Sequence, residues 1–225
     1  MTECASFAQQ SALAVEKVTK IHPQRKYLVL LPRTNAEFAK WTLGTSSDDD
    51  GMYVAPQSSG AAGWIAIDTG ESIGSGATVL DNPSFLEHVV RHEFFHANTL
   101  PEIDSVGNAP KWVIEGFAEW FASSADVVFP QHAPPAVLPT KDHEFAHDTK
   151  THAYARSFMF ISYLVARFGQ AAAIRFYKRA LEPAYGTTAA SFAHVFGHSL
   201  ASVEHAWAQQ YRKQVAGLTV DVYEA

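Results

Sequence analysis

Cysteine is almost absent from this sequence, because Cys4 is the only one among 225 residues. An intramolecular disulfide and a zinc site built on several thiolates are therefore both excluded. The sequence also lacks an apolar run of the about 20 residues that a membrane-spanning helix needs. Positive charge is scarce as well, since 17 Lys and Arg stand against 23 Asp and Glu and no basic run appears. We therefore expect neither a membrane span nor a nucleic-acid partner.

The first residues of the sequence bear on the compartment that we expect for the protein. Residues 1–4 show neither the basic segment nor the start of the apolar segment that is typical of a secretory signal peptide. On that ground we expect a cytoplasmic protein, or a secreted one if the sequence begins after a removed signal. Apolar residues make up 47% of the chain, which is ordinary for a globular protein with a full core. No pattern in the sequence indicates the oligomeric state.

Histidine, in contrast, is abundant, and two of the 11 histidines form the pattern His-Glu-x-x-His at residues 92–96. Residues four apart lie on the same face of an α-helix, so the imidazoles of His92 and His96 can reach one Zn²⁺. Glu93 lies beside them, where it can take a proton from a metal-bound water. Glu115 follows His96 with 18 residues between them and can act as the third ligand. Three protein ligands and one open position are the catalytic arrangement of zinc.

The residues before this motif favour a buried helix. Asn82-Pro83 is a typical helix start, because proline is common at the first helical position. An apolar stripe at helical spacing follows, and its members are Phe85, Leu86, Val89 and Val90. The sequence therefore predicts that the two ligand histidines lie on a helix that faces the core.

The helix of Glu115 carries two further informative residues. Glu119 lies one turn after Glu115, so we expect its carboxylate to accept the ring N–H of a ligand histidine. The alternative is an ordinary solvated carboxylate. Gly116 costs about 1 kcal/mol relative to alanine inside a helix, which indicates a packing reason for it. We expect that this glycine lets its helix approach the histidine helix closely.

A second copy of the pattern occurs at residues 143–147, with His143, Glu144 and His147. Three prolines precede it, no apolar helical stripe runs through it, and Ala166 stands at the position that Glu115 occupies after the first copy. We predict that this copy is a polar loop or a short exposed helix. A weak accessory metal site is the alternative. The remaining histidines are interpreted as surface or structural residues, namely His22, His88, His132, His194, His198 and His205.

These motifs resemble those of the gluzincins, zinc metallopeptidases defined by His-Glu-x-x-His and a glutamate from a following helix. Residues 112–120 are similar to the W-[LV]-x-E-G-x-A-E element of that clan, and the 18-residue spacing is that of its aminopeptidase N-like branch. Residues 154–158 and 163–169 are similar to the compact bacterial peptidase-MA-like domain, and this similarity extends over residues 27–212. The resemblance implies one Zn²⁺ per chain, held by His92, His96 and Glu115, with Glu93 as the general base.

The activity implied by the resemblance is hydrolysis of peptide bonds in a peptide or protein substrate. Aminopeptidases of that branch bind the substrate amino terminus with a G-x-M-E-N element, whereas residues 74–78 here contain no acid. We therefore favour an endopeptidase over an aminopeptidase. One alternative is a zinc-bound module that binds partners without turnover, although such a site would need no base at Glu93. The other alternative is a zinc hydrolase that acts on a non-peptide amide or ester.

Catalysis would also need a hydrogen-bond donor for the oxyanion. Tyr154 is our candidate, both by the resemblance and by its place early in the helix that follows a loop. Its phenol can donate without carrying charge. The competing candidates are Tyr163, Tyr185 and His152.

The order of the predicted elements indicates the fold class. Strand-like segments come first and helices follow, which is typical of an α+β protein. The expected elements are helices at 5–20 and 35–43, strands at 27–31, 52–55 and 63–68, and helices at 152–168, 170–182, 187–196 and 200–214. We expect a zincin-like fold, with a small N-terminal mixed sheet, a mainly helical C-terminal lobe and the active-site helix between them.

A single catalytic domain would then span residues 1–225, with an α/β lobe at 1–98 and a helical lobe at 99–225. In zincins a strand beside the site pairs with the extended substrate. The candidates are residues 64–68 and residues 77–80, and for each the alternative is a strand paired inside the sheet.

Overall fold

The computed structural model describes residues 2–21, 27–44, 50–56, 63–70, 79–100, 109–123 and 134–216. The chain forms two compact units. The first contains Met1–Val106 and Trp120–Asp126, and the second contains Gly107–Glu119 and Val127–Ala225. The expectation of one catalytic domain over the whole chain stays a prediction.

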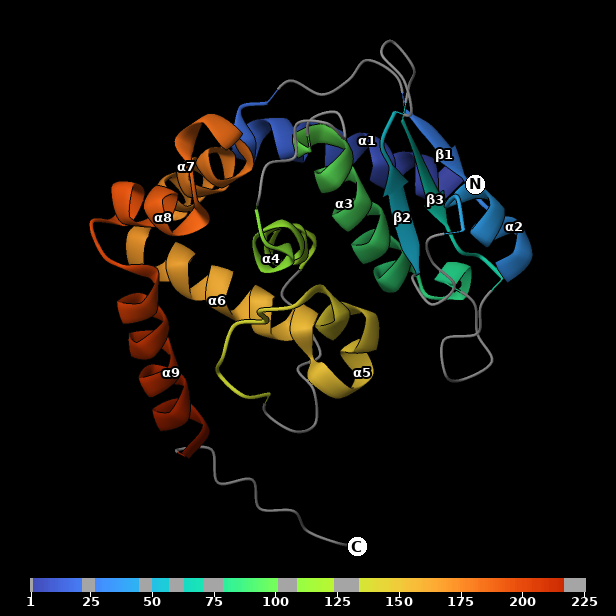
Figure 1. Ribbon diagram of the computed structural model, residues 1–225. Coiled ribbons are helices and arrows are strands. Elements are labelled where there is room, and N and C mark those ends of the chain that lie inside the picture. The colour runs from blue at the N-terminus through green and yellow to red at the C-terminus, as the bar shows by residue number, and fades with distance from the viewer. Residues whose placement is uncertain are drawn as a thin grey trace, which may run out of the picture. The chain divides into compact units, whose positions relative to one another are not determined.

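The first unit combines helices with a small mixed sheet (Figure 1). Its elements are α1 (Thr2–Thr19), β1 (Leu28–Leu30), α2 (Asn35–Trp41), β2 (Gly51–Val54), β3 (Trp64–Ile67), the 3₁₀ turn η1 (Val79–Asp81) and α3 (Pro83–Thr99). The strand order is β1-β3-β2, with β1 parallel and β2 antiparallel to β3. The mixed α+β class and the small N-terminal sheet expected from the sequence are confirmed.

Strand β3 is the central strand of this sheet. It has β1 on one side and β2 on the other, so residues 64–66 have a partner strand at both edges and Ile67 pairs with β2. The alternative of a strand paired inside the sheet is therefore correct for residues 64–66 of this candidate. The second candidate, residues 77–80, lies partly outside the described residues, and Leu80 belongs to the 3₁₀ turn η1.

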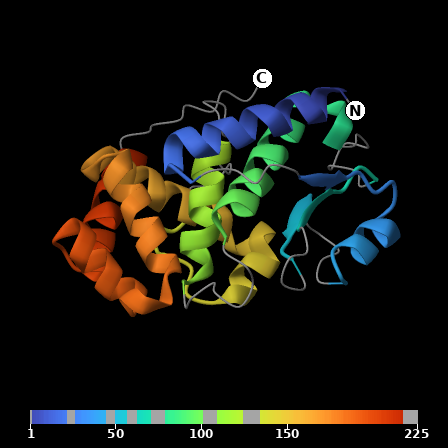
Figure 2. The ribbon, with the colours of Figure 1, turned by 90° about the horizontal axis from the view of Figure 1, so that it is seen from above.

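Helix α3 begins where the sequence predicted. The side-chain oxygen of Asn82 accepts a hydrogen bond from the backbone N–H of Phe85 at 3.2 Å, and Pro83 occupies the first turn. The helix packs against α1 and against strands β2 and β3, and α1 and α3 lie side by side (Figure 2). The core of this unit consists of Cys4, Ile65, Ile67, Val79, Leu86, Val89, Val90, Phe94 and Ala97. The apolar stripe thus fixes which way α3 faces.

The second unit is helical in its described part. Its elements are most of α4 (Lys111–Ala122), the 3₁₀ helix η3 (Asp142–His147), α5 (Asp148–Thr151), α6 (Ala153–Phe168), α7 (Gln170–Leu181), the 3₁₀ turn η4 (Pro183–Tyr185), α8 (Thr188–Phe196) and α9 (Leu200–Ala216). Figure 1 shows α7, α8 and α9 gathered at one end of α6. The mainly helical C-terminal half expected from the sequence is confirmed.

An aromatic cluster fills the core of the second unit. Phe176 is fully buried and lies against the rings of Trp112, Phe117, Phe192 and Phe196, with centroid distances of 5.2–6.4 Å. Because Trp112 and Phe117 belong to α4, the cluster fixes the orientation of that helix within the unit.

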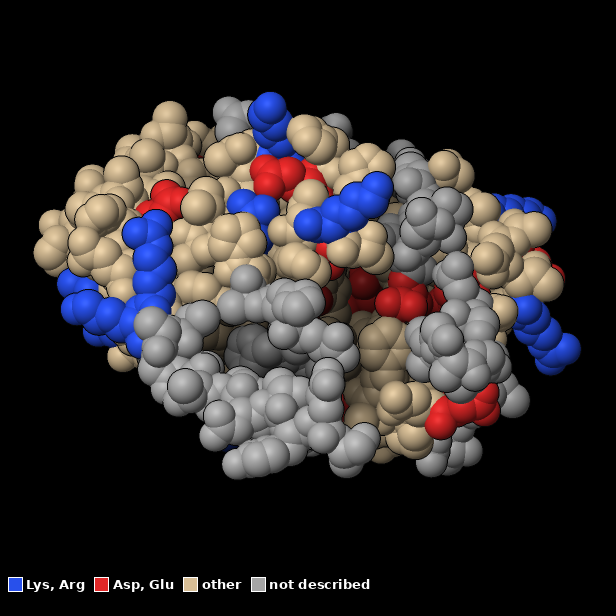
Figure 3. Space-filling model, turned by 90° about the horizontal axis from the view of Figure 1, so that it is seen from below, with Lys and Arg blue, Asp and Glu red and all other residues tan. Residues whose placement is uncertain are grey.

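The described part of the chain contains no helix whose length and hydropathy would allow it to cross a membrane. On the face shown in Figure 3, the coloured Lys and Arg side chains stand singly or in small groups among acidic and uncharged residues.

Candidate metal centre

Two histidines of α3 face one another in the buried part of the first unit. The side chains of His92 and His96 are only 8% and 6% exposed, and their Nε2 atoms lie 2.9 Å apart. Two nitrogens that each bind a tetrahedral Zn²⁺ at about 2.0–2.1 Å would be about 3.3 Å apart. The two Nε2 atoms lie at hydrogen-bond distance, about 0.4 Å closer than this value, so the imidazoles point at one another and could share a metal ion.

Glu93 lies between these histidines in the sequence and is itself buried, with 6% exposure. Strand β2 begins directly against its side chain. A Cβ atom on Gly51 would lie 3.1 Å from Cγ and 3.4 Å from Oε1 of Glu93, and only 2.7 Å from Cγ1 of Val89. The absence of a side chain at Gly51 therefore leaves the room that the Glu93 side chain occupies.

Glu115 and Glu119 are half-buried and lie one turn apart on helix α4. The glycine between them does not have the role expected from the sequence. A Cβ atom on Gly116 would lie 3.0 Å from Cγ1 of Ile161 and 3.0 Å from Cβ of Ser157, and both residues belong to α6. Successive residues of a helix point about 100° apart, so Gly116 faces a different neighbour from Glu115. The close approach is thus between α4 and α6, and the expectation that it serves the histidine helix is wrong.

The last turn of α4, residues 120–122, belongs to the first unit, where it is attached to α3. Nη2 of Arg91 donates a hydrogen bond to the backbone carbonyl of Phe121 at 2.9 Å. The Arg91 guanidinium also lies 5.4 Å from the centre of the Phe121 ring, and that ring lies 5.3 Å from the ring of Phe95. Arg91 and Phe95 of α3 therefore both contact Phe121, and all three residues belong to the first unit.

Two overlapping groups of side chains on α3 and α4 could hold a metal ion, among the residues that the structure describes. The first consists of His92, His96 and Glu115, the three ligands predicted from the sequence. The second consists of His88, His92 and Glu119. Within each group, one ligand atom from each residue lies within 4.8 Å of the others.

Two residues near this centre were missed in the sequence. His88 precedes His92 by four residues and its ring centre lies 6.5 Å from that of His92, so the spacing alone could have indicated it. Asp148 follows the second His-Glu-x-x-His copy directly. Burial raises the pKa of its carboxyl, the N–H groups of Tyr154 and Ala153 and the charge of His152 lower it, and the negative charge of Glu119 raises it. The net effect is a raised pKa, and no local sequence pattern indicates this neighbourhood.

Tyr154 lies in the first turn of α6 and is half-buried. Its backbone N–H donates to Oδ1 of Asp148 at 3.0 Å. Its ring meets the ring of Phe145 edge-on, with 5.2 Å between centroids.

The competing oxyanion donors have other surroundings. The hydroxyl of Tyr163 accepts a hydrogen bond from Nη1 of Arg167 at 2.5 Å, and Tyr185 is 46% exposed and lies under the guanidinium of Arg179. His152 is the junction between α5 and α6, where it adopts a left-handed conformation with φ of 52°.

The second His-Glu-x-x-His copy forms the 3₁₀ helix η3, in which His143 and His147 are exposed. With three residues per turn, positions four apart point about 120° apart, so these two imidazoles do not share a face. Neither belongs to a metal-binding group among the described residues. Glu144 instead forms an ion pair with Arg156, in which Oε2 and Nη1 are 2.8 Å apart.

Helices α3 and α4 thus carry every ligand, base and supporting carboxylate that the first motif predicted. Comparison of the sequence with models of protein families found no match, and a search of curated proteins found none either.

Proposed function

We propose that this protein is a zinc metallopeptidase with a zincin-like fold and that it hydrolyses peptide bonds in a peptide or protein substrate. The observation that carries the proposal is the buried pair His92 and His96, whose Nε2 atoms face one another beside the buried carboxyl of Glu93. A third potential ligand supports it, because Glu115 offers an oxygen within 4.8 Å of a ligand atom of each histidine. Two imidazoles and one carboxylate form the donor set of many catalytic zinc sites.

His92, His96 and Glu115 would hold one Zn²⁺ per chain. When bound, the ion would supply Lewis acidity that polarises the scissile carbonyl and lowers the pKa of a water toward about 7. Glu93 would take the proton of the attacking water on its carboxylate and deliver it to the nitrogen of the departing amine. Its burial favours this role, because the proton then passes between two groups that are shielded from bulk solvent.

Glu119 would fix the orientation of a ligand histidine. Its carboxylate shares a group with His92 in which the ligand atoms lie within 4.8 Å. A carboxylate that accepts the second ring N–H of a ligand histidine sets its tautomer and raises its basicity. Tyr154 would donate its phenolic hydrogen to the oxyanion that develops on the scissile carbonyl, and losing one such donor costs about 10²–10³ in rate.

Cleavage within a chain is favoured over removal of the amino-terminal residue. The supporting observation is the lack of an acidic residue at positions 74–78, which lie outside the described residues. An aminopeptidase needs a carboxylate that pairs with the substrate ammonium group, whereas an endopeptidase does not.

The experiment that tests the proposal combines zinc content with peptide cleavage. Elemental mass spectrometry should find one zinc per chain in the wild type and in His147→Ala, and none in His96→Ala. His147 is a matched control, because it is the corresponding histidine of the second copy. Glu93→Gln should retain zinc and lose cleavage of a fluorogenic peptide library by orders of magnitude.

Each other outcome would identify a different function. Zinc in the wild type with no cleavage of any peptide would favour the partner-binding module or a hydrolase of a non-peptide amide or ester. Loss of zinc in His147→Ala would show that the metal binds at the second copy. If no zinc bound after reconstitution, the proposal would fail.

A further inference from the structure

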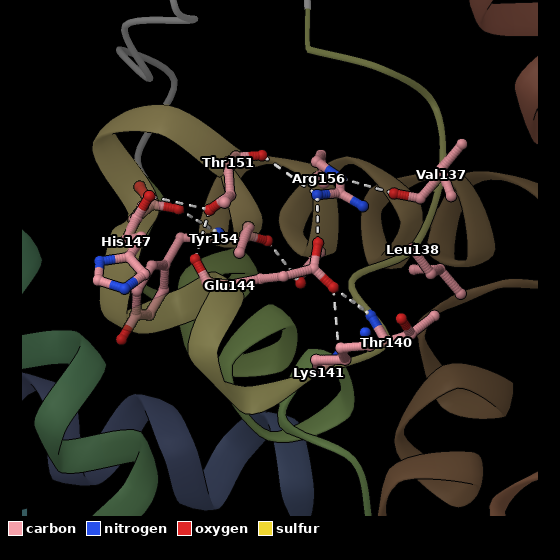
Figure 4. Close-up of polar contacts among 12 residues, drawn as sticks. Val137, Leu138, Thr140, Lys141, Glu144, His147, Thr151, Tyr154 and Arg156 are labelled. Carbon is pink, nitrogen blue, oxygen red and sulfur yellow. Dashed lines mark hydrogen bonds and ion pairs between the residues drawn. The ribbon is translucent and has the colours of Figure 1, made fainter.

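Arg156 is a charged side chain buried in the second unit, with 6% exposure. Its guanidinium donates to three acceptors in different segments, as Figure 4 shows. Nε donates to the carbonyl of Val137 at 2.7 Å, and Nη1 donates to Oε2 of Glu144 at 2.8 Å and to the carbonyl of Thr151 at 3.2 Å. A buried cation is costly unless its donors are paired. Arg156 therefore fixes the positions of all three acceptors relative to the first turns of α6.

Glu144, the glutamate of the second His-Glu-x-x-His copy, uses both carboxylate oxygens in this network. While Oε2 pairs with Arg156, Oε1 accepts the backbone N–H groups of Thr140 at 2.8 Å and Lys141 at 3.1 Å. Burial alone would raise the pKa of Glu144, but these hydrogen bonds and the Arg156 charge bring it below the ordinary value. The carboxylate is thus an ionised acceptor whose two oxygens are both occupied, which does not suit a general base.

The same network surrounds the start of α6, where Tyr154 lies. Thr151 donates its hydroxyl to the carbonyl of Glu144, and the ring of Phe145 packs edge-on against the ring of Tyr154. The chain then passes through His152 in a left-handed conformation, which costs a non-glycine residue about 1–2 kcal/mol. Such a conformation persists only when the surrounding contacts determine it. Asp148 completes the junction by accepting the backbone N–H of Tyr154.

We propose that the Glu144–Arg156 pair positions Tyr154 for catalysis, so that the second His-Glu-x-x-His copy acts on the reaction through its glutamate and not through its histidines. Arg156 follows Tyr154 by two residues on α6, and Phe145 follows Glu144 directly, so the ion pair fixes both the backbone and the ring neighbour of Tyr154. The inference rests on the proposed function for the role of the phenol. A displacement of about 1 Å in a positioned group can cost about 10²-fold in rate.

The first test measures the position of Tyr154 without using activity. The protein is labelled with 3-fluorotyrosine, and the ¹⁹F line of Tyr154 is assigned by its loss in Tyr154→Phe. This line should shift or broaden in Glu144→Gln and stay in place in Glu182→Gln, which makes the same change at an exposed residue outside the network. An unchanged Tyr154 line in Glu144→Gln would overturn the proposal. If that variant does not fold, Glu144→Asp keeps the charge, shortens the side chain and is judged in the same way.

The second test is a double-mutant cycle on cleavage of one quenched fluorogenic peptide. Glu144→Gln should lower kcat about 10-fold with little change in KM and full zinc content, because a misplaced donor weakens transition-state binding. In the Tyr154→Phe background the same change should have no further effect. An equal loss in both backgrounds would show a general structural effect and overturn the proposal.

The two proposals fail in different ways. If wild type cleaves no peptide, the proposed function fails, and a catalytic role for the pair fails with it, whatever the ¹⁹F line shows. If wild type is active and Glu93→Gln is not, the proposed function stands, and the cycle alone decides the role of Glu144. His143→Ala and His147→Ala should retain activity. A loss of activity in either variant would show that the second copy acts through its histidines instead.

Discussion

Gly51 lies at the start of strand β2, directly against the side chain of the proposed base Glu93. Changing it to alanine would place a methyl group 2.7 Å from Cγ1 of Val89 and 3.1 Å from Cγ of Glu93. Both distances are shorter than an ordinary van der Waals contact, so the Glu93 side chain or the strand has to move. We expect Gly51→Ala to retain zinc and to lower kcat on the order of 10–100-fold, because a displaced general base loses most of its effect.

Val89 provides the control for this prediction. The closest contact of the added methyl group is with Val89, so Gly51→Ala combined with Val89→Ala should recover part of the lost kcat. Val89→Ala alone leaves a cavity in the core and should lower stability by about 1–3 kcal/mol with less effect on kcat. If Gly51→Ala were as active as the wild type, Glu93 would not depend on the start of β2.

Single residues also show where reading the sequence succeeds and where it fails. The spacing of His92 and His96 predicts their common face, because a helix fixes the direction of residues four apart. The direction of Gly116 could not be predicted in the same way, since it depends on which helix packs against that side of α4, and this neighbour proved to be α6. His88 was missed because a third histidine at the same spacing is more often a surface residue than a ligand.

Among elements, the connection between α3 and the end of α4 determines a further prediction. Arg91 donates to the carbonyl of Phe121 in the last turn of α4, and Glu115 lies on the same helix. Arg91→Ala removes this hydrogen bond and the contact with the Phe121 ring. We expect zinc affinity to fall about 10–100-fold, as it does when residues that orient metal ligands are changed.

Zinc affinity is measured for this prediction by competition with a chromophoric chelator. Arg175→Ala is the matched control, because Arg175 is an exposed arginine on α7. Unchanged affinity in Arg91→Ala would mean that the aromatic contact of Phe121 with Phe95 holds the end of α4 without the arginine.

Elements were predictable where their signals are local. Asn82 and Pro83 begin α3, and α6 and α8 end at Phe168 and Phe196, as expected from the sequence. The place of a strand in the sheet is not local. Residues 64–67 form the middle strand because residues 28–30 and 51–54 pair with them from the two sides. The sequence of residues 64–67 does not itself indicate this position in the sheet. The strand itself was therefore predicted, whereas its place inside the sheet was left open as one of two alternatives.

For the whole molecule, the sequence predicted the mixed class, the small sheet near the N-terminus and the helical C-terminal half. These follow from the order of apolar patterns along the chain. The unit to which α4 belongs could not be predicted, because residues 111–119 of this helix belong to the second unit and residues 120–122 to the first. A helix that takes part in two cores carries one continuous apolar pattern, so the sequence does not mark the boundary within it.

Zinc binding should also be visible in the stability of the whole chain. An ion that binds only the folded protein stabilises it by about 4 kcal/mol when its free concentration is about 1,000 times the Kd. For a chain of this size, that corresponds to a rise in the unfolding midpoint on the order of 10 °C.

We therefore expect a chelator to lower the midpoint of the wild type and of His147→Ala by this amount, as measured by circular dichroism at 222 nm. His96→Ala should unfold at one temperature with or without zinc, because it lacks one of the two facing imidazoles. A wild type that is insensitive to the chelator would show that the buried histidines are a structural pair, and the metal would then have no part in holding α3 and α4 in place.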